Sequence, residues 1–183
     1  MFADNTLTPR EAIRLCALGT LALADSPLRY SELANAIRHF TDRITGPSLD
    51  IMGTSVELLK FEGLVEPIEG VGMEDDATLR LTDKGEEELT SLMTSRIRSA
   101  GGEVNKLITT LKLRFLHLLD VEDQREQVDI LIENCDTELA RLDDLRAHHE
   151  GDPGHLATWL DHEIQQLEAH LDWLEDFRRK LGE

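Results

Sequence analysis

The chain has 183 residues and is strongly acidic, with 19 Lys and Arg against 37 Asp and Glu and a formal net charge of −18. Hydrophobic residues make up 40% and aromatic residues only 4%, which predicts a core of Leu, Ile, Val and Ala carried mainly by helices. No apolar run approaches the roughly 18 residues of a membrane span, and no leader pattern opens the chain. We therefore expect a cytoplasmic protein without a membrane partner.

Three helices are expected first. Thr8 can cap a helix that begins at Pro9, and Glu11 completes the capping box. The turn at Asp25–Pro27 ends this helix, and Gly63 ends the third. Apolar residues at helical spacing predict these helices over about residues 9–24, 30–40 and 47–62, with a polar stretch at 41–46 after the second.

Two strand-like runs follow, Leu64–Ile68 and Thr78–Thr82, separated by the acidic, glycine-bearing loop Glu69–Ala77. This is the pattern of a hairpin with a long tip. Thr82 or Asp83 is then predicted to cap a helix with an acidic first turn, where negative charge suits the helix dipole. Three helices, a hairpin and a further helix are the order of a winged helix-turn-helix, whose third helix can lie in the DNA major groove.

The second half of the chain is dominated by heptad-like spacing, in three runs over residues 104–118, 128–142 and 160–174. Each run is short, which suits helices packed on one another and covered by a second copy. We predict a mainly α fold: a winged helix-turn-helix domain with a two-stranded wing over residues 1–92 and a C-terminal helical dimerisation domain over 93–183. The predicted dimer contacts are Val128, Ile132, Leu139, Leu160, Ile164, Leu167, Leu171 and Leu174.

Several strings resemble PadR-type transcriptional regulators over nearly the whole chain. Pro47–Leu49 followed by Gly63–Val65 is similar to the family's third helix and its exit into the wing. Leu81-Thr82 with Gly85 is similar to the junction between wing and helix, and Leu118–Leu181 resembles the helical domain that pairs subunits. The resemblance implies a homodimeric transcriptional regulator, a repressor, that binds double-stranded operator DNA and responds to a small aromatic effector.

The positions expected to contact DNA carry few cations. Residues 1–92 hold 8 basic and 17 acidic side chains, and residues 93–183 hold 11 and 20, so neither half is a basic module. Hydroxyls and helix ends can still contact phosphates. The predicted DNA contacts are Arg29, Ser31, Ser48, Thr54, Ser55, Lys60 and Arg80, several of which could equally belong to an ordinary solvated face.

Two alternatives explain the acidic surface. In the first, the chain is a protein-interaction module that keeps the fold but has lost DNA binding, because few cations remain to contact phosphates. In the second, the acidity reflects a salt-rich cytoplasm in which screening weakens repulsion.

The remaining candidate residues point to packing more than to chemistry. Trp159 and Trp173 lie fourteen residues apart on the last helix, hence roughly on one face. They suit a dimer core, or an effector pocket between subunits as the resemblance implies.

Cys16 and Cys135 are expected to be reduced core cysteines. The histidine spacing does not match a zinc site, and no catalytic motif is present. We therefore predict no enzyme, metal site or cofactor.

Overall fold

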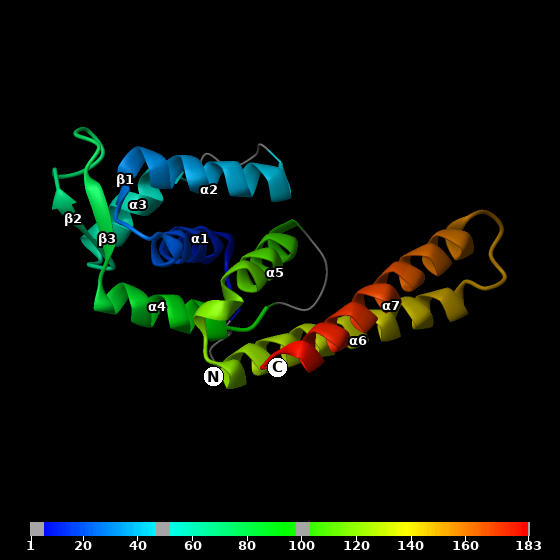
Figure 1. Ribbon diagram of the computed structural model, residues 1–183. Coiled ribbons are helices and arrows are strands. Elements are labelled where there is room, and N and C mark those ends of the chain that lie inside the picture. Colours follow the sequence, from blue (N-terminus) through cyan, green and yellow to red (C-terminus); the bar gives the residue numbers. More distant parts are fainter. Residues whose placement is uncertain (1–5, 47–51, 98–102, 183) are drawn as a thin grey trace, which may run out of the picture. The chain divides into compact units, whose positions relative to one another are not determined.

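The computed structural model describes residues 6–46, 52–97 and 103–182, and the chain divides into two compact units, Met1–Leu116 and His117–Glu183 (Figure 1). It confirms the mainly helical, winged helix-turn-helix class. The first unit contains α1 (Pro9–Leu23), β1 (Leu28–Arg29), α2 (Tyr30–Thr45), α3 (Met52–Phe61), β2 (Val65–Glu69), β3 (Thr78–Leu81), α4 (Asp83–Thr94) and α5 (Glu103–Phe115). The short 3-10 turn Leu116–Leu118 follows α5, and the second unit contains α6 (Val121–His148) and α7 (Leu156–Lys180).

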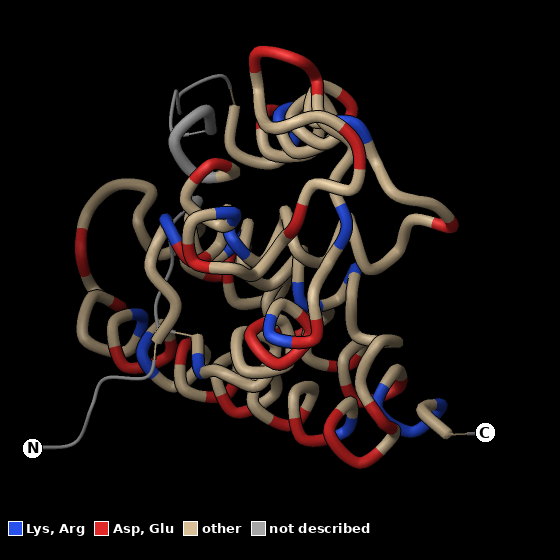
Figure 2. Tube along the Cα trace, turned by 90° about the vertical axis from the view of Figure 1, so that its left-hand side faces the viewer, with Lys and Arg blue, Asp and Glu red and all other residues tan. Residues whose placement is uncertain are grey.

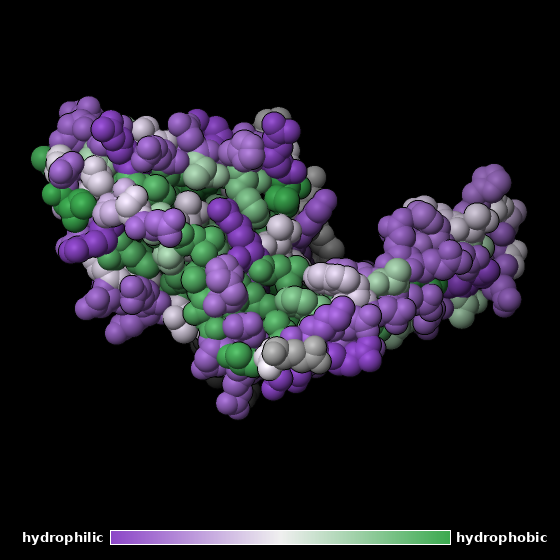
Figure 3. Space-filling model, viewed as in Figure 1, coloured by the Kyte–Doolittle hydropathy of each residue, from purple (hydrophilic) through white to green (hydrophobic). Residues whose placement is uncertain are grey.

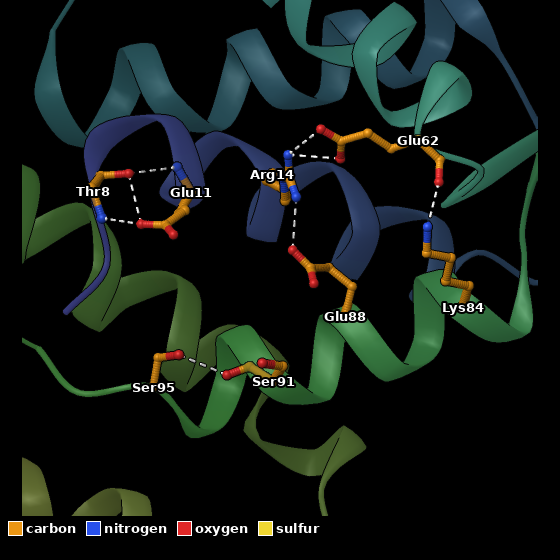
Figure 4. A network of polar contacts seen from close by, with 8 residues as sticks. All are labelled: Thr8, Glu11, Arg14, Glu62, Lys84, Glu88, Ser91 and Ser95. Carbon is orange, nitrogen blue, oxygen red and sulfur yellow. Dashed lines mark hydrogen bonds and ion pairs between the residues drawn. The ribbon is translucent and has the colours of Figure 1, made fainter. Parts of the chain in front are cut away.

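Helix α1 is the centre of the first unit. Its predicted capping box is confirmed: the Thr8 hydroxyl accepts from Glu11 N at 3.3 Å, and the Glu11 carboxylate accepts from Thr8 N at 2.6 Å (Figure 4). Leu15, Cys16 and Leu18 are fully buried because α1 packs against α2, α3, α4, α5 and β3. Burial also raises the pKa of the Cys16 thiol to about 11.

Helix α2 is longer than the sequence predicted: it continues to Thr45, whereas the pattern indicated an end near residue 40. The threonines after that point do not break the helix, because their hydroxyl groups form hydrogen bonds with backbone carbonyls of the same helix. Thr41 is buried and donates to Ile37 O at 3.0 Å, and Thr45 donates to Thr41 O at 3.0 Å. Gly46, at φ +80°, then ends the helix.

The wing is an antiparallel hairpin of β2 and β3, which confirms the predicted hairpin. Val65 pairs with Leu81 and Pro67 with Leu79, and the register shifts between Pro67 and Glu69. The short strand β1 pairs with β3, so the sheet order is β1-β3-β2. The sequence pattern did not predict β1, because two residues are too few to show an alternation.

The junction between the wing and α4 depends on close backbone packing. Thr82 lies outside β3 and is the N-cap of α4: its hydroxyl accepts from Gly85 N at 3.0 Å and donates to Gly63 O at 2.8 Å. A Cβ at Gly85 would lie 2.1 Å from Leu64 O. Only glycine fits there, which gives a physical reason for the glycine in this junction.

Helix α5 packs against α1 and α2 and is tied to the end of α4. Lys112 is 2% exposed, and its ammonium group donates to Met93 O and Ser95 O at the C-terminal end of α4. Burial lowers the pKa of Lys112 to about 7. These contacts place α5 in the first unit. The boundary at residue 92 between a winged helix-turn-helix domain and a dimerisation domain stays a prediction.

The second unit is a hairpin of the two long helices α6 and α7 (Figure 1). Val128, Leu160 and Leu174 are fully buried, and Cys135 is 9% exposed. Arg178 pairs with Asp129 through two hydrogen bonds of 2.7 and 3.0 Å. Among the residues that the structure describes, no helix has both the length and the apolar character that a membrane crossing requires.

Candidate nucleic-acid interface

The elements of the predicted DNA-binding face gather at one end of the first unit. The beginning of α2, helix α3 and the wing lie together there (Figure 1). Helix α3 turns Val56 and Leu59 into the core, at 2% and 1% exposure, while Leu58 and Phe61 on its other side are exposed. The side of α3 that carries Leu58 and Phe61 is therefore open, and the wing loop contacts α3 through Lys60 Nζ and Val71 O.

The N-terminus of α2 is closed by a carboxylate from the wing. Ser31 donates to Asp76 through its backbone N at 2.8 Å and its hydroxyl at 3.0 Å. Arg29 lies 3.9 Å from the same carboxylate. Asp76 has φ +52°, a left-handed conformation that Asp adopts more readily than most residues. Arg29 and Ser31, two of the predicted DNA contacts, thus both face an acid of the same chain.

The other two cations of the predicted contact set, Lys60 and Arg80, are also paired with acids. Lys60 Nζ lies 2.9 Å from Glu57 Oε2 and donates to Val71 O at 2.8 Å, which ties the last turn of α3 to the wing loop. Arg80 pairs with Glu66, its cross-strand partner on β2, with Nε donating at 3.1 Å. Duplex DNA would have to compete with these carboxylates for both side chains.

The wing loop between β2 and β3 is held by its own hydrogen bonds. The Asp75 carboxylate accepts from Gly72 N at 2.9 Å and from Val71 N at 2.7 Å, and these bonds lower the pKa of Asp75. Ala77 N donates to Gly72 O at 2.9 Å. Glu74, Asp75 and Asp76 are consecutive in this loop, and acidic positions recur along the trace in Figure 2. The loop therefore presents a fixed, negatively charged tip.

Part of the predicted contact set lies outside what the structure describes. Ser48 and the start of the third helix near Pro47 fall in the undescribed segment 47–51, and the side chains of Thr54 and Ser55 are also outside the described set. Their contact with DNA stays a prediction.

Another cation of this domain has a structural role instead. Arg14 of α1 lies 2.8 Å from Glu62 and 2.8 Å from Glu88, so it links the end of α3 to α4 (Figure 4). Lys84 supports the same junction by donating to Glu62 O at 2.8 Å. The acids that pair with the predicted contact residues were missed by sequence reasoning; only the Glu57–Lys60 pair, three residues apart on one helix, had a local signal.

The predicted dimer and effector residues fall into three groups. Val128, Leu160 and Leu174 are fully buried within the single chain, so a second copy cannot touch them while the hairpin is intact. Trp159 and Trp173 are 52% and 48% exposed on α7, and Trp173 stacks on His170 and Phe177 with ring centroids 5.8 and 5.4 Å apart. The half-buried residues are Ile132, Leu139, Ile164, Leu167 and Leu171.

Comparison with known proteins identifies the family. A family model described as "Putative AphA-like transcriptional regulator" matches residues 2–178. The chain belongs to the AphA-like family of transcriptional regulators, which is PadR-like. This confirms the kind of regulator that the sequence indicated. No curated protein matches the chain.

A solved structure is also similar to this regulator: Bacillus subtilis PadR in complex with operator DNA. It has 14% sequence identity and a TM-score of 0.38, and the match covers 92% of this chain and 98% of that one.

Proposed function

We propose that this AphA-like regulator binds double-stranded operator DNA as a homodimer, with the open face of α3 in the major groove. The observation that carries the proposal is the arrangement of α3. Val56 and Leu59 fix the helix to the core, while its opposite side is exposed. A helix held in this way can enter a groove.

The acidic surface limits where phosphates can be contacted. Arg29, Ser31, Lys60 and Arg80 are each engaged by a carboxylate, so the proposed interface relies on the predicted hydroxyl contacts of Ser48, Thr54 and Ser55. It also relies on exchanging the paired carboxylates for phosphates. Affinity for DNA should therefore be modest, and it should depend only weakly on salt, because few Lys or Arg side chains would displace counterions from phosphates.

Dimerisation is assigned to the second unit. Trp159 and Trp173 leave aromatic surface exposed on α7, and such side chains are enriched in interfaces. A second copy covering them would complete the predicted dimerisation domain over residues 93–183. A small aromatic effector bound at the same tryptophans would shift the spacing of the two α3 helices and so release the operator, which makes the protein a cytoplasmic repressor.

The test is a titration of fluorescent duplex DNA from the protein's own promoter region at about 50 mM salt, followed by anisotropy. We expect saturable binding that the combined variant Ser48→Ala, Thr54→Ala, Ser55→Ala weakens. Thr90→Ala is the matched control, because this exposed hydroxyl lies on α4 and bonds within its own helix. A folded, dimeric protein without any shift in anisotropy would refute DNA binding.

A second candidate is a protein-interaction module that keeps the fold without binding DNA. The pairing of Arg29, Lys60 and Arg80 with acids favours it. Each of these cations would have to give up its carboxylate partner before it could bind a phosphate. Recovery of a basic partner protein from cells, free of nucleic acid, together with a negative DNA titration, would support this candidate.

A further inference from the structure

The wing and the last turn of α3 together carry apolar side chains that project into solvent. Phe61, Val71 and Met73 are 88%, 74% and 57% exposed, the largest values among the large hydrophobic residues that the structure describes. Hydrophobic residues are visible among hydrophilic ones at this end of the first unit (Figure 3). Exposed apolar side chains that gather in one place are typical of an interaction site.

These side chains border a common surface. An open hollow of about 540 Å³ is lined by wing-loop residues and by Glu57 of α3. Lys60 Nζ joins the two elements through its 2.8 Å bond to Val71 O. Phe61 lies one helical turn beyond Glu57, on the same side of α3. We call this the wing surface, and define it as Glu57, Phe61, Val71, Met73, Glu74 and Asp75.

The wing surface is negatively charged at its edges. Glu57, Glu74 and Asp75 supply carboxylates. The neighbouring cation Lys60 is already engaged by Glu57 and by Val71 O. The second oxygen of Glu57, Oε1, is buried without a hydrogen-bond partner in the described structure. An apolar centre with carboxylates beside it complements a segment that is both apolar and basic.

The surface is also formed in advance of binding. Asp75 fixes the loop through Val71 N and Gly72 N, and Ala77 N closes it on Gly72 O. Asp76 fastens the same loop to Ser31 of α2. A partner would therefore not have to order this loop, which lowers the entropy cost of association.

The charge of the wing surface selects the kind of partner. DNA phosphates would meet the carboxylates of Glu57, Glu74 and Asp75, which is repulsive. A second copy would place the same acids against each other, which is also repulsive. We propose that the wing surface docks a basic amphipathic segment of a partner protein, with apolar side chains on Phe61, Val71 and Met73 and Lys or Arg beside the acids. This goes beyond the proposed function, because it assigns the wing loop and the last turns of α3, with Glu57 and Phe61, to protein and leaves to DNA the beginning of α3, which carries Thr54 and Ser55.

The experiment uses the full chain, labelled with 15N, and an amphipathic helical peptide of Leu and Lys about four turns long. We expect chemical-shift changes at the amides of residues 57–61 and 70–76. The double variant Val71→Ser, Met73→Ser should bind the peptide about tenfold more weakly, because its apolar contacts are lost. Both side chains are exposed, so the variant should unfold at the same temperature as the original protein.

Two matched controls separate docking from general attraction to an acidic protein. Leu23→Ser removes an exposed apolar side chain elsewhere in the first unit, and Glu87→Gln removes a charge on α4; neither should change peptide affinity by as much as the double variant. Equal affinity of the double variant and the original protein would overturn the proposal.

Two further measurements test the other occupants. Weaker binding of duplex DNA by the double variant than by the original protein would assign the wing to nucleic acid. Loss of self-association in the double variant, followed by sedimentation velocity, would assign it to a second copy. Either result overturns docking of a basic segment, and neither depends on whether α3 binds DNA.

Discussion

Asp76 decides what the N-terminus of α2 can bind. Its carboxylate accepts both the amide and the hydroxyl hydrogen of Ser31 and faces Arg29. An arginine, a hydroxyl and a free amide at a helix start are groups that also bind a phosphate. The negative charge that a DNA backbone would bring is already supplied by the chain.

The substitution Asp76→Asn tests this competition. Asparagine tolerates positive φ and keeps an acceptor for Ser31, so the fold should persist. Because the charge is gone, the affinity for promoter duplex should rise about fivefold, which corresponds to about 1 kcal/mol. The measurement is anisotropy of labelled duplex, with Glu87→Gln as the control for net charge. Weaker binding would show that Asp76 positions the wing instead of competing with DNA.

Lys112 makes stability depend on pH. Its pKa is about 7 in the folded chain and about 10.5 when unfolded, so between these values only the unfolded chain keeps the proton. The free energy of unfolding should therefore rise with pH from 7 to 10, by about 1.4 kcal/mol per unit at most. Lys112→Met should lose this rise, measured by urea unfolding across that range. Lys106→Met, an exposed lysine on the same helix, should keep it.

Only some of these residues could be placed from sequence. Hydroxyls and cations near the expected helix starts marked Arg29 and Ser31 as candidates. Their acidic partner could not be found, because Asp76 is 45 residues from Ser31 and meets it only through the sheet. Lys112 carried no local signal either: a lysine on a helix is normally exposed.

Among the elements, caps and turns were the most predictable features. The capping box of α1, the hairpin and the cap at Thr82 follow from residue types at fixed spacing. The end of α2 was not predictable, because Thr41 and Thr45 look like loop residues until their hydroxyls are seen to bond within the helix. Burial of one face of α2 stabilises the helix beyond the point at which its polar residues indicated an end.

The junction of wing and α4 should not tolerate a side chain. Gly85→Ala would place a methyl group against Leu64 O, where 2.1 Å separates the two positions. The backbone has to shift, and we expect a loss of about 3 kcal/mol in the free energy of unfolding. Thermal and urea unfolding measure this loss. Gly151→Ala is the control, since a Cβ there meets nothing within 4 Å; equal stability of the two variants would contradict the packing argument.

At the scale of the whole molecule, the heptad pattern was informative about helices but not about their partners. It marked the apolar positions of α5, α6 and α7. It could not tell a face that packs within the chain from one that packs on a second copy. Val128, Leu160 and Leu174 lie on the first kind of face. The same spacing serves both kinds of contact, so the sequence leaves the choice open.

The dimer proposed here rests on surface that remains exposed. Trp159→Ser combined with Trp173→Ser should shift the protein toward monomer in sedimentation velocity, because two large aromatic contacts are lost. Leu118→Ser, which also changes an exposed apolar residue of the second unit, is the control. An unchanged dimer in the double variant would place the interface elsewhere.

The open end of the α6–α7 hairpin is fastened from both sides. Arg125, near the start of α6, donates to Leu181 O just beyond α7, and Arg178 holds Asp129. A single protease nick in the connection at residues 149–155 would then leave two fragments that remain associated, because their clasp lies at the far end from the cut. Cleavage would show on a denaturing gel and not in the native mass, so this connection is a suitable point for inserting a reporter domain.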